Sequence, residues 1–150
     1  MDVLNIVILG VILSIVFFEI TNISPGGIIV PGLLVAYINQ PERIVYTVIV
    51  SIITYLLVKL LSRYVLVYGK RKFALMIIVS VVVNLILELL IHATSFSLIN
   101  VAIIGYTIPG IIANDIYKQG IVKTIPSLVI VTLILELIVI ISNSIGIIRL

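Results

Sequence analysis

Two carboxylates stand at similar places in the two halves of this chain. Glu19 and Glu88 each fall near the end of a long apolar run, in Val3–Ile20 and Phe73–Ile91. A carboxylate within a membrane is costly, so it marks a functional position by default. The pair could contact a proton, a cation that balances charge, or a basic side chain of a partner. The alternative is that both carboxylates lie in water at the membrane interface.

A Pro-Gly pair lies near the middle of each of two shorter apolar stretches. The pairs are Pro31-Gly32 and Pro109-Gly110, and the stretches are Pro25–Ile38 and Ile103–Tyr117. Proline removes a backbone donor and glycine adds conformational freedom, so a continuous helix should break there. In lipid, the freed backbone groups must be satisfied by protein or cavity water. We favour a pore or substrate site; the alternative is a kink where small residues let helices pack closely.

Polar side chains follow the second Pro-Gly pair. Asn114, Asp115 and Gln119 lie within a few residues of one another. They could line a polar path, or they could cap the end of a helix at the cytoplasmic interface. We include Asn114 and Gln119, with the two Pro-Gly pairs, in a predicted substrate path.

The strongest basic cluster is Lys70-Arg71-Lys72. The positive-inside rule predicts that it lies on the cytoplasmic side, where it would anchor the topology. It could also hold a cytoplasmic partner or a polyanion, because arginine binds a carboxylate through two parallel hydrogen bonds. The two roles are compatible.

Signatures of catalysis are missing from the sequence. Cysteine is absent, and the single histidine, His92, cannot form a metal site by itself. Gly69-Lys70 is not a phosphate loop, because the further glycines and the hydroxyl residue are missing. We therefore predict no catalytic residue, no metal and no cofactor in this chain. The net charge of +3 is small and does not indicate a nucleic-acid surface.

The elements that must position these residues are membrane helices. Of the 150 residues, 63% are hydrophobic and 10% charged, and the mean hydropathy is +1.45. A soluble domain carries about 25% charged residues. Four runs reach the length of a membrane helix, near 20 residues. They are Val3–Ile20, Ile44–Leu66, Phe73–Ile91 and Val122–Ile148. We expect one all-α integral membrane domain over residues 1–150.

The two halves look like copies of one unit. The string Gly27-Ile-Ile-Val-Pro-Gly aligns with Gly105-Tyr-Thr-Ile-Pro-Gly, and the surrounding helices and glutamates follow in the same order. We predict repeat 1 at about 3–66, a cytoplasmic basic loop at 67–73 and repeat 2 at about 74–148. Each repeat reads as a helix, a helix broken at Pro-Gly, and a helix.

The number of crossings depends on the broken segments. If both span the membrane, six crossings invert the second repeat and place Lys118 and Lys123 on the cytoplasmic side. If both are re-entrant, four crossings make the repeats parallel. The positive-inside rule favours six. Inverted repeats with broken helices are typical of transporters, where the half-helix N-termini face a midplane site.

Three strings resemble the C subunit of poly-γ-glutamate synthases, the PgsC or CapC family. They are GGIIVPG…NQP at 26–41, YGKRKFA at 68–74 and IPGIIANDIYKQG at 108–120. The resemblance covers essentially the whole chain. It implies a multi-pass subunit in a bacterial cytoplasmic membrane, part of a complex that makes and exports a γ-linked polyanion.

The resemblance also implies the partners. A ligase subunit (PgsB/CapB-like) would carry the ATP and divalent-metal chemistry, and an extracellular subunit (PgsA/CapA-like) would serve export or anchoring. A small fourth subunit is compatible with the family. Because six short helices make a small bundle, we also expect an oligomer in membrane lipid. Two rival functions remain open: a small stand-alone secondary transporter and a passive membrane scaffold for the ligase.

Overall fold

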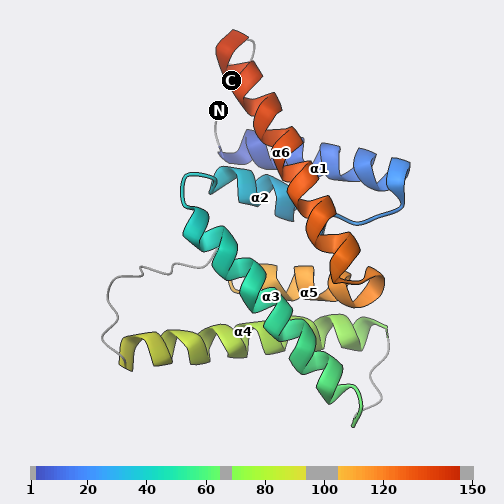
Figure 1. Cartoon of the computed structure of the whole chain (residues 1–150), viewed down its shortest axis with the longest axis vertical. Helices are drawn as coiled ribbons and strands as arrows, with labels where there is room; N and C mark the ends of the chain where they lie inside the picture. The colour runs from blue at the N-terminus through green and yellow to red at the C-terminus, as the bar shows by residue number, and fades with distance from the viewer. Residues whose placement is uncertain (1–2, 65–68, 94–104, 146–150) are drawn as a thin grey trace.

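The chain is all-α, as predicted from its sequence. The computed structural model describes residues 3–64, 69–93 and 105–145. Within these ranges there are six helices (Figure 1). They are α1 (Val3–Thr21), α2 (Val30–Ala36), α3 (Pro41–Leu61), α4 (Lys70–Ala93), α5 (Ile108–Gln119) and α6 (Ile121–Ile145).

Four helices in the described part of the chain are long and apolar enough to cross a membrane. They are α1, α3, α4 and α6. At most 39% of the most apolar window of any of them is buried inside the protein. Apolar surface exposed on this scale is stable only when lipid covers it. The chain is therefore a membrane protein.

The two short helices begin at the Pro-Gly pairs. Pro31 and Pro109 each occupy the second residue of their helix. Proline is tolerated there because its missing N–H would have no helical acceptor anyway. Residues 22–29, before α2, are not helical, and Gly105–Thr107 form no helix before α5. The break expected in the middle of each stretch thus falls just before the Pro-Gly pair.

Each Pro-Gly glycine brings its short helix against the long helix that precedes it. A Cβ atom on Gly32 would lie 2.9 Å from the Cα atom of Val7 in α1. A Cβ atom on Gly110 would lie 2.9 Å from the Cα atom of Ile77 in α4. Gly10 of α1 faces Gly32, since its own Cβ would lie 2.4 Å from the Gly32 Cα atom. Only small residues permit so close an approach of two helix backbones.

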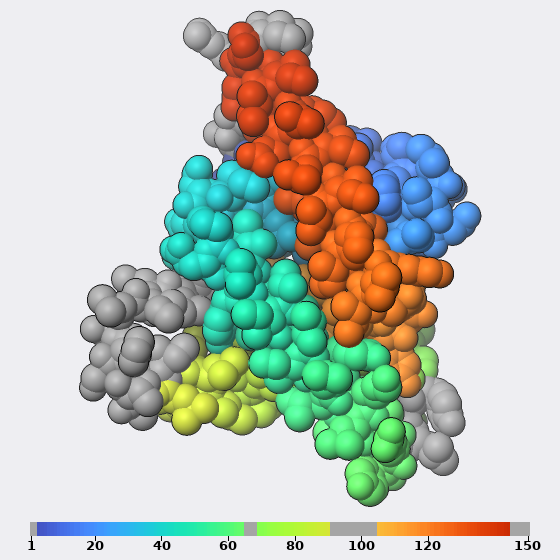
Figure 2. Space-filling model, in the orientation of Figure 1, coloured from blue at the N-terminus to red at the C-terminus, as the bar shows by residue number. Residues whose placement is uncertain are grey.

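The remaining helices, α3 and α6, pack across the two halves of the chain. α3 packs on α5 and α4, whereas α6 packs on α2, α5 and α1. Together they lie across the face seen in Figure 2. An apolar cluster joins α2, α5 and α6, with the buried residues Val30, Leu34, Ile108, Ile112, Ile116 and Leu128. This cluster is the centre of the fold.

Five helix ends lie on one side of the molecule, at the right in Figure 1: α1, α3 and α5 end there, and α4 and α6 begin there. A contact between two of these ends confirms the placement: the Lys72 Nζ atom lies 3.8 Å from the ring centroid of Tyr117. We call this side the basic end. It carries Lys59, Arg63, Lys70, Arg71, Lys72, Lys118 and Lys123.

The basic cluster is helical, which corrects its prediction as a loop. The apolar run predicts that the third long helix begins at Phe73, but this helix, α4, begins at Lys70. Lysine and arginine are good helix formers, so they extend the helix by one turn. Residues 67 and 68 of the expected loop lie outside the described residues.

Candidate functional site: a cavity at the basic end

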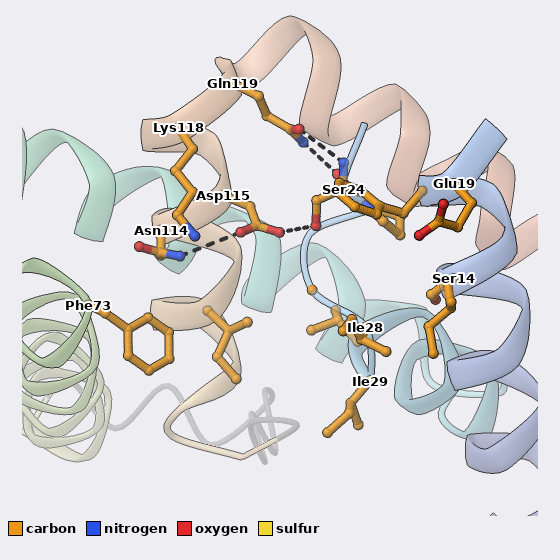
Figure 3. A pocket seen from close by; sticks show the side chains of 16 residues that line it. Ser14, Glu19, Ser24, Ile28, Ile29, Phe73, Asn114, Asp115, Lys118 and Gln119 are labelled. Carbon is orange, nitrogen blue, oxygen red and sulfur yellow. Dashed lines mark hydrogen bonds between the residues drawn. The ribbon is translucent and has the colours of Figure 1, made fainter. Parts of the chain in front are cut away.

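A cavity of about 770 Å³ lies between α1, the 22–29 segment, the start of α4 and α5 (Figure 3). Its polar lining residues are Ser14, Glu19, Ser24, Asn114, Asp115, Lys118 and Gln119. The rest of the wall is mainly apolar and includes Phe18, Ile28, Ile29, Phe73 and Ile111. A largely apolar cavity with a few polar groups is the usual form of a ligand site.

The 22–29 segment forms one wall of the cavity because the chain turns back after α1. Asn22 adopts a left-handed conformation, with φ of 54°. Asparagine tolerates this region better than most residues. Gly26 also has positive φ, and a Cβ atom there would lie 2.6 Å from the Leu128 side chain. The turn therefore brings Ser24 up to the junction of α5 and α6.

Gln119 fixes Ser24 by pairing with its backbone. The backbone N–H of Ser24 donates to the Gln119 Oε1 atom at 3.0 Å, and the Gln119 Nε2 group donates back to the Ser24 carbonyl. Gln119 Nε2 also donates to Thr124 Oγ1 at 3.0 Å, and the Ser127 hydroxyl donates to the Ser24 carbonyl at 3.3 Å. One amide side chain thus satisfies both backbone groups of a non-helical residue, which is what a buried loop requires.

Asp115 is a buried carboxylate in the cavity wall, with 7% of its surface exposed. The Ser24 hydroxyl donates to its Oδ2 atom, and the Asn114 amide donates to Oδ1 at 3.5 Å. Both donors are uncharged. Lys118 follows on the same helix, and its side chain extends towards Asn114 and Asp115 in Figure 3. The wall therefore holds a carboxylate whose hydrogen bonds come from neutral groups.

Glu19 approaches the cavity from the end of α1. It is exposed, and the last turn of α1 contains no basic residue. A carboxylate at a helix C-terminus faces the negative end of the helix dipole, so the helix itself does not favour it there. The cavity is thus bordered by two carboxylates, Glu19 and Asp115, and one ammonium, Lys118.

Glu88 does not line the cavity that Glu19 borders. It lies near the far end of α4 and accepts a hydrogen bond from the Tyr106 hydroxyl at 2.9 Å. This carboxylate raises the pKa of the Tyr106 hydroxyl above its ordinary value, because the charged acceptor favours the protonated phenol. The two glutamates occupy opposite ends of the molecule, and the functional roles expected for them stay predictions.

Of the predicted path residues, Asn114 and Gln119 line the cavity and the Pro-Gly pairs do not. The pairs Pro31-Gly32 and Pro109-Gly110 are buried, and their glycines contact α1 and α4. The backbone N–H groups after the glycines are already bonded, Leu33 to Ile29 and Ile111 to Thr107, at 3.2 Å. The Pro-Gly pairs are packing positions in this structure, and their role in a polymer path stays a prediction.

The predicted docking residues form the first turn of α4. Lys70 and Arg71 are exposed, and Lys72 is half-buried against Tyr117. This turn contains no acidic residue. Cations at a helix N-terminus meet the positive end of the dipole, so the helix does not explain their position. The position of these cations must therefore serve something outside the helix. We predict two such roles, anchoring of the topology and docking of a partner or polyanion.

Sequence reasoning missed Ser24 and Lys118 as parts of one site. The spacing of Asp115, Lys118 and Gln119 could have shown that they share a helix face, because residues three and four apart are neighbours. No local signal pairs Ser24 with Gln119, which is 95 residues away. Within the described ranges, no three His, Cys, Asp or Glu side chains gather in a group that could hold a metal.

Known proteins resemble the chain over most of its length. The family model "Capsule biosynthesis CapC" matches residues 9–125. The PGA biosynthesis protein CapC of Bacillus subtilis (strain 168) is 42% identical over 127 residues, which cover 84% of this chain and 85% of that protein. The capsule biosynthesis protein CapC of Bacillus anthracis is 38% identical over 125 residues, covering 83% of this chain and 84% of that protein.

No solved structure matches the chain at a significant level. The family match spans the described cavity, since it includes Ser14 and Gln119. The resemblance expected from the three sequence strings is confirmed by the family model and by both relatives. This chain belongs to the CapC family of capsule biosynthesis proteins.

Proposed function

We propose that the chain is the membrane subunit of a poly-γ-glutamate synthase and export complex in a bacterial cytoplasmic membrane. It supports polymer synthesis by a separate ligase subunit and passage of the polymer across the membrane. The observation that carries this proposal is the 42% identity to a PGA biosynthesis protein over 84% of the chain. The family match over residues 9–125 includes the cavity and the basic end together.

A duplicated unit is part of the proposal, and burial supports it. Adding 78 to the number of each buried residue of α2 gives a residue that is buried in α5. The α2 residues are Val30, Pro31, Gly32, Leu34 and Val35, and their counterparts are Ile108, Pro109, Gly110, Ile112 and Ala113.

Adding 77 to the number of each buried residue of α3 likewise gives a residue that is buried in α6. The α3 residues are Thr47, Val50, Ser51, Thr54 and Val58, and their counterparts are Thr124, Ser127, Leu128, Val131 and Leu135. Equivalent residues thus face the core in both units.

The same shift of 77 also relates two side-chain hydrogen bonds. The Thr47 hydroxyl donates to the Arg43 carbonyl at 2.7 Å, and the Thr124 hydroxyl donates to the Gly120 carbonyl at 2.9 Å. Gly32 on α1 and Gly110 on α4 make matching close approaches. These correspondences support two units of the same construction, each with its own Pro-Gly helix.

Six crossings fit the helix ends better than four. With re-entrant Pro-Gly segments, the end of α5 and the start of α4 would lie on opposite membrane faces. In the structure, Lys72 of α4 stacks on Tyr117 of α5, and Phe73 borders the same cavity as Glu19 and Lys118. This placement supports Pro-Gly segments that cross, with the second unit inverted.

The basic end then faces the cytoplasm, where it meets the ligase and the polymer. It carries seven of the nine lysines and arginines of the chain, against two carboxylates, Glu19 and Asp115. Such a concentration of positive charge attracts a polycarboxylate and raises its rate of encounter. The ATP and divalent metal of the synthase belong to the ligase in this proposal, and the chain itself binds neither. An extracellular subunit receives the polymer.

Charge reversal at the basic turn tests the function. The variant Lys70→Glu, Arg71→Glu, Lys72→Glu should abolish polymer production in a strain that depends on this chain, because the turn would repel the polymer and a complementary ligase surface. Polymer in the medium and capsule fraction is measured by glutamate release after acid hydrolysis. The matched control is Lys70→Arg with Lys72→Arg, which keeps the charge and should keep the yield.

The variant must be shown in the membrane fraction at the wild-type level. Normal polymer yield from an inserted charge-reversed protein would rule out docking at this turn. Transport of glutamate oligomers by the purified chain without any partner would favour the stand-alone transporter. A scaffold would tolerate Gly32→Leu and Gly110→Leu in assembled complexes with no loss of synthesis or export.

A further inference from the structure

We propose that the cavity at the basic end binds the amino-terminal unit of a γ-linked glutamate chain. Asp115 holds its ammonium, Lys118 holds its α-carboxylate, and Glu19 adds negative charge at the border of the same cavity. This inference rests on the proposed function, since it names the part of the polymer that the cavity takes. The structure assigns the ends of the ligand from the charges that border the cavity.

Asp115 can pair with a ligand cation, because the exposed Lys118 extends towards it without forming an ion pair with it (Figure 3). This carboxylate is 7% exposed, and its hydrogen-bond donors, the Ser24 hydroxyl and the Asn114 amide, are uncharged. A buried carboxylate is stabilised far better when a cation also pairs with it. Glu19 adds a second negative charge to the border of the same cavity. A ligand ammonium is the group that pairs with Asp115, and Glu19 adds to the negative potential that attracts it.

Lys118 and the apolar wall select the rest of the ligand. The amino-terminal unit of a γ-linked chain carries its ammonium and a carboxylate on one carbon, followed by two methylenes and an amide. Lys118 supplies the positive partner for that carboxylate, and Ile28, Ile111 and Phe73 offer apolar surface for the methylenes. Asn114 has an amide that can pair with the linking amide. Every chemical part of the unit thus has a partner at the cavity.

Internal units of the polymer do not fit the same site. They carry a carboxylate but no ammonium, so Asp115 and Glu19 repel them. The exposed cations of the basic end, such as Lys70 and Arg71, suit those units instead. The cavity therefore distinguishes the end of the chain from its interior.

Binding of two short γ-linked glutamate oligomers tests the inference. One has a free amino terminus and the other is N-acetylated; both are titrated into the full-length protein in lipid nanodiscs by calorimetry. The free-amine oligomer should bind about tenfold or more tightly, which is the effect of one partly buried charge pair. Asp115→Asn should raise its Kd to that of the acetylated oligomer. The control Glu42→Gln, an exposed carboxylate in the first turn of α3, should change neither Kd.

A second variant separates charge from folding. Ser24→Ala removes the hydroxyl hydrogen bond to Asp115 but keeps its carboxylate, so discrimination that depends only on this hydrogen-bonded arrangement would be lost in Ser24→Ala. Preserved discrimination in Ser24→Ala and its loss in Asp115→Asn support the inference. Equal affinity of the wild-type protein for both oligomers, or unchanged discrimination in Asp115→Asn, would overturn it.

Failure of this inference can be told from failure of the proposed function. A wild-type chain that binds neither oligomer but restores polymer production in cells overturns the cavity assignment and leaves the function standing. Discrimination by a chain whose deletion leaves polymer yield unchanged supports the cavity chemistry and overturns the proposed function.

Discussion

The contact between α4 and α5 depends on the missing side chain of Gly110. A Cβ atom there would lie 2.9 Å from both the Ile77 Cα atom and the Met76 carbonyl oxygen, and 3.0 Å from the Ser80 Oγ atom. Two of these three atoms belong to the backbone, which cannot rotate away. An ordinary contact begins at 3.4 Å, so Gly110→Ala must part the two helices by about 0.5 Å.

The energetic cost follows from overpacking. Inserting a carbon into a well-packed contact destabilises by about 1–3 kcal/mol. Alanine favours a helix over glycine by up to about 1 kcal/mol, which offsets part of that cost. We therefore expect Gly110→Ala to lower the free energy of unfolding by about 1–2 kcal/mol. Gly10→Ala should cost more, because its Cβ atom would lie 2.4 Å from the Gly32 Cα atom.

The assay is unfolding of the purified protein in mixed micelles, followed by circular dichroism as the fraction of SDS increases. Ala74→Leu is the control, because this exposed α4 residue can gain carbon atoms without meeting another helix; it should stay within about 0.5 kcal/mol of the wild type. Gly110→Ala as stable as the wild type would refute the close approach. A loss of stability in Gly10→Ala that is smaller than or equal to that in Gly110→Ala would refute the ordering by distance.

Two further perturbations address the cavity wall and the topology. Gln119→Leu leaves the backbone N–H and carbonyl of Ser24 without their amide partner. It should therefore lower the free energy of unfolding by about 1–3 kcal/mol in the same SDS titration. Gln40→Leu, at the start of α3, serves as the control. Lys118→Cys should react with a membrane-impermeant maleimide in inverted vesicles and not in intact cells, because six crossings place it in the cytoplasm; labelling from outside would instead favour re-entrant segments.

The long helices could be predicted well from the sequence, because a membrane imposes a length and a composition on them. Val3–Ile20 was expected as a helix and α1 is Val3–Thr21. Helix ends were less predictable. α3 ends at Leu61, whereas the apolar run continues to Leu66, and residues 65 and 66 lie outside the described part of the chain. Hydropathy gives the extent of apolar residues but not the turn at which the chain leaves the helix axis.

The candidate site could be predicted only in part. The sequence predicts functional roles for Glu19, Asn114 and Gln119 because they are polar residues near apolar segments. All three line the cavity. Their common site depends on Ser24, whose hydrogen bond to Gln119 spans 95 residues. A contact of that separation follows from how the helices pack, and no local pattern carries it. The Pro-Gly pairs suited both a pore and a packing contact, and the structure uses their glycines for packing.

The packing of α3 has a consequence for how the protein is made. Its buried face includes the polar residues Thr47, Ser51 and Thr54, and this face packs on α4 and α5, which are synthesised later. α1 and α2 likewise receive α6, which is also synthesised after them. The inner face of the first half therefore stays uncovered until α4, α5 and α6 have been synthesised. A nascent chain that stalls after α3 presents that hydroxyl-bearing face to lipid, where membrane proteases and insertion factors can detect an unfinished protein.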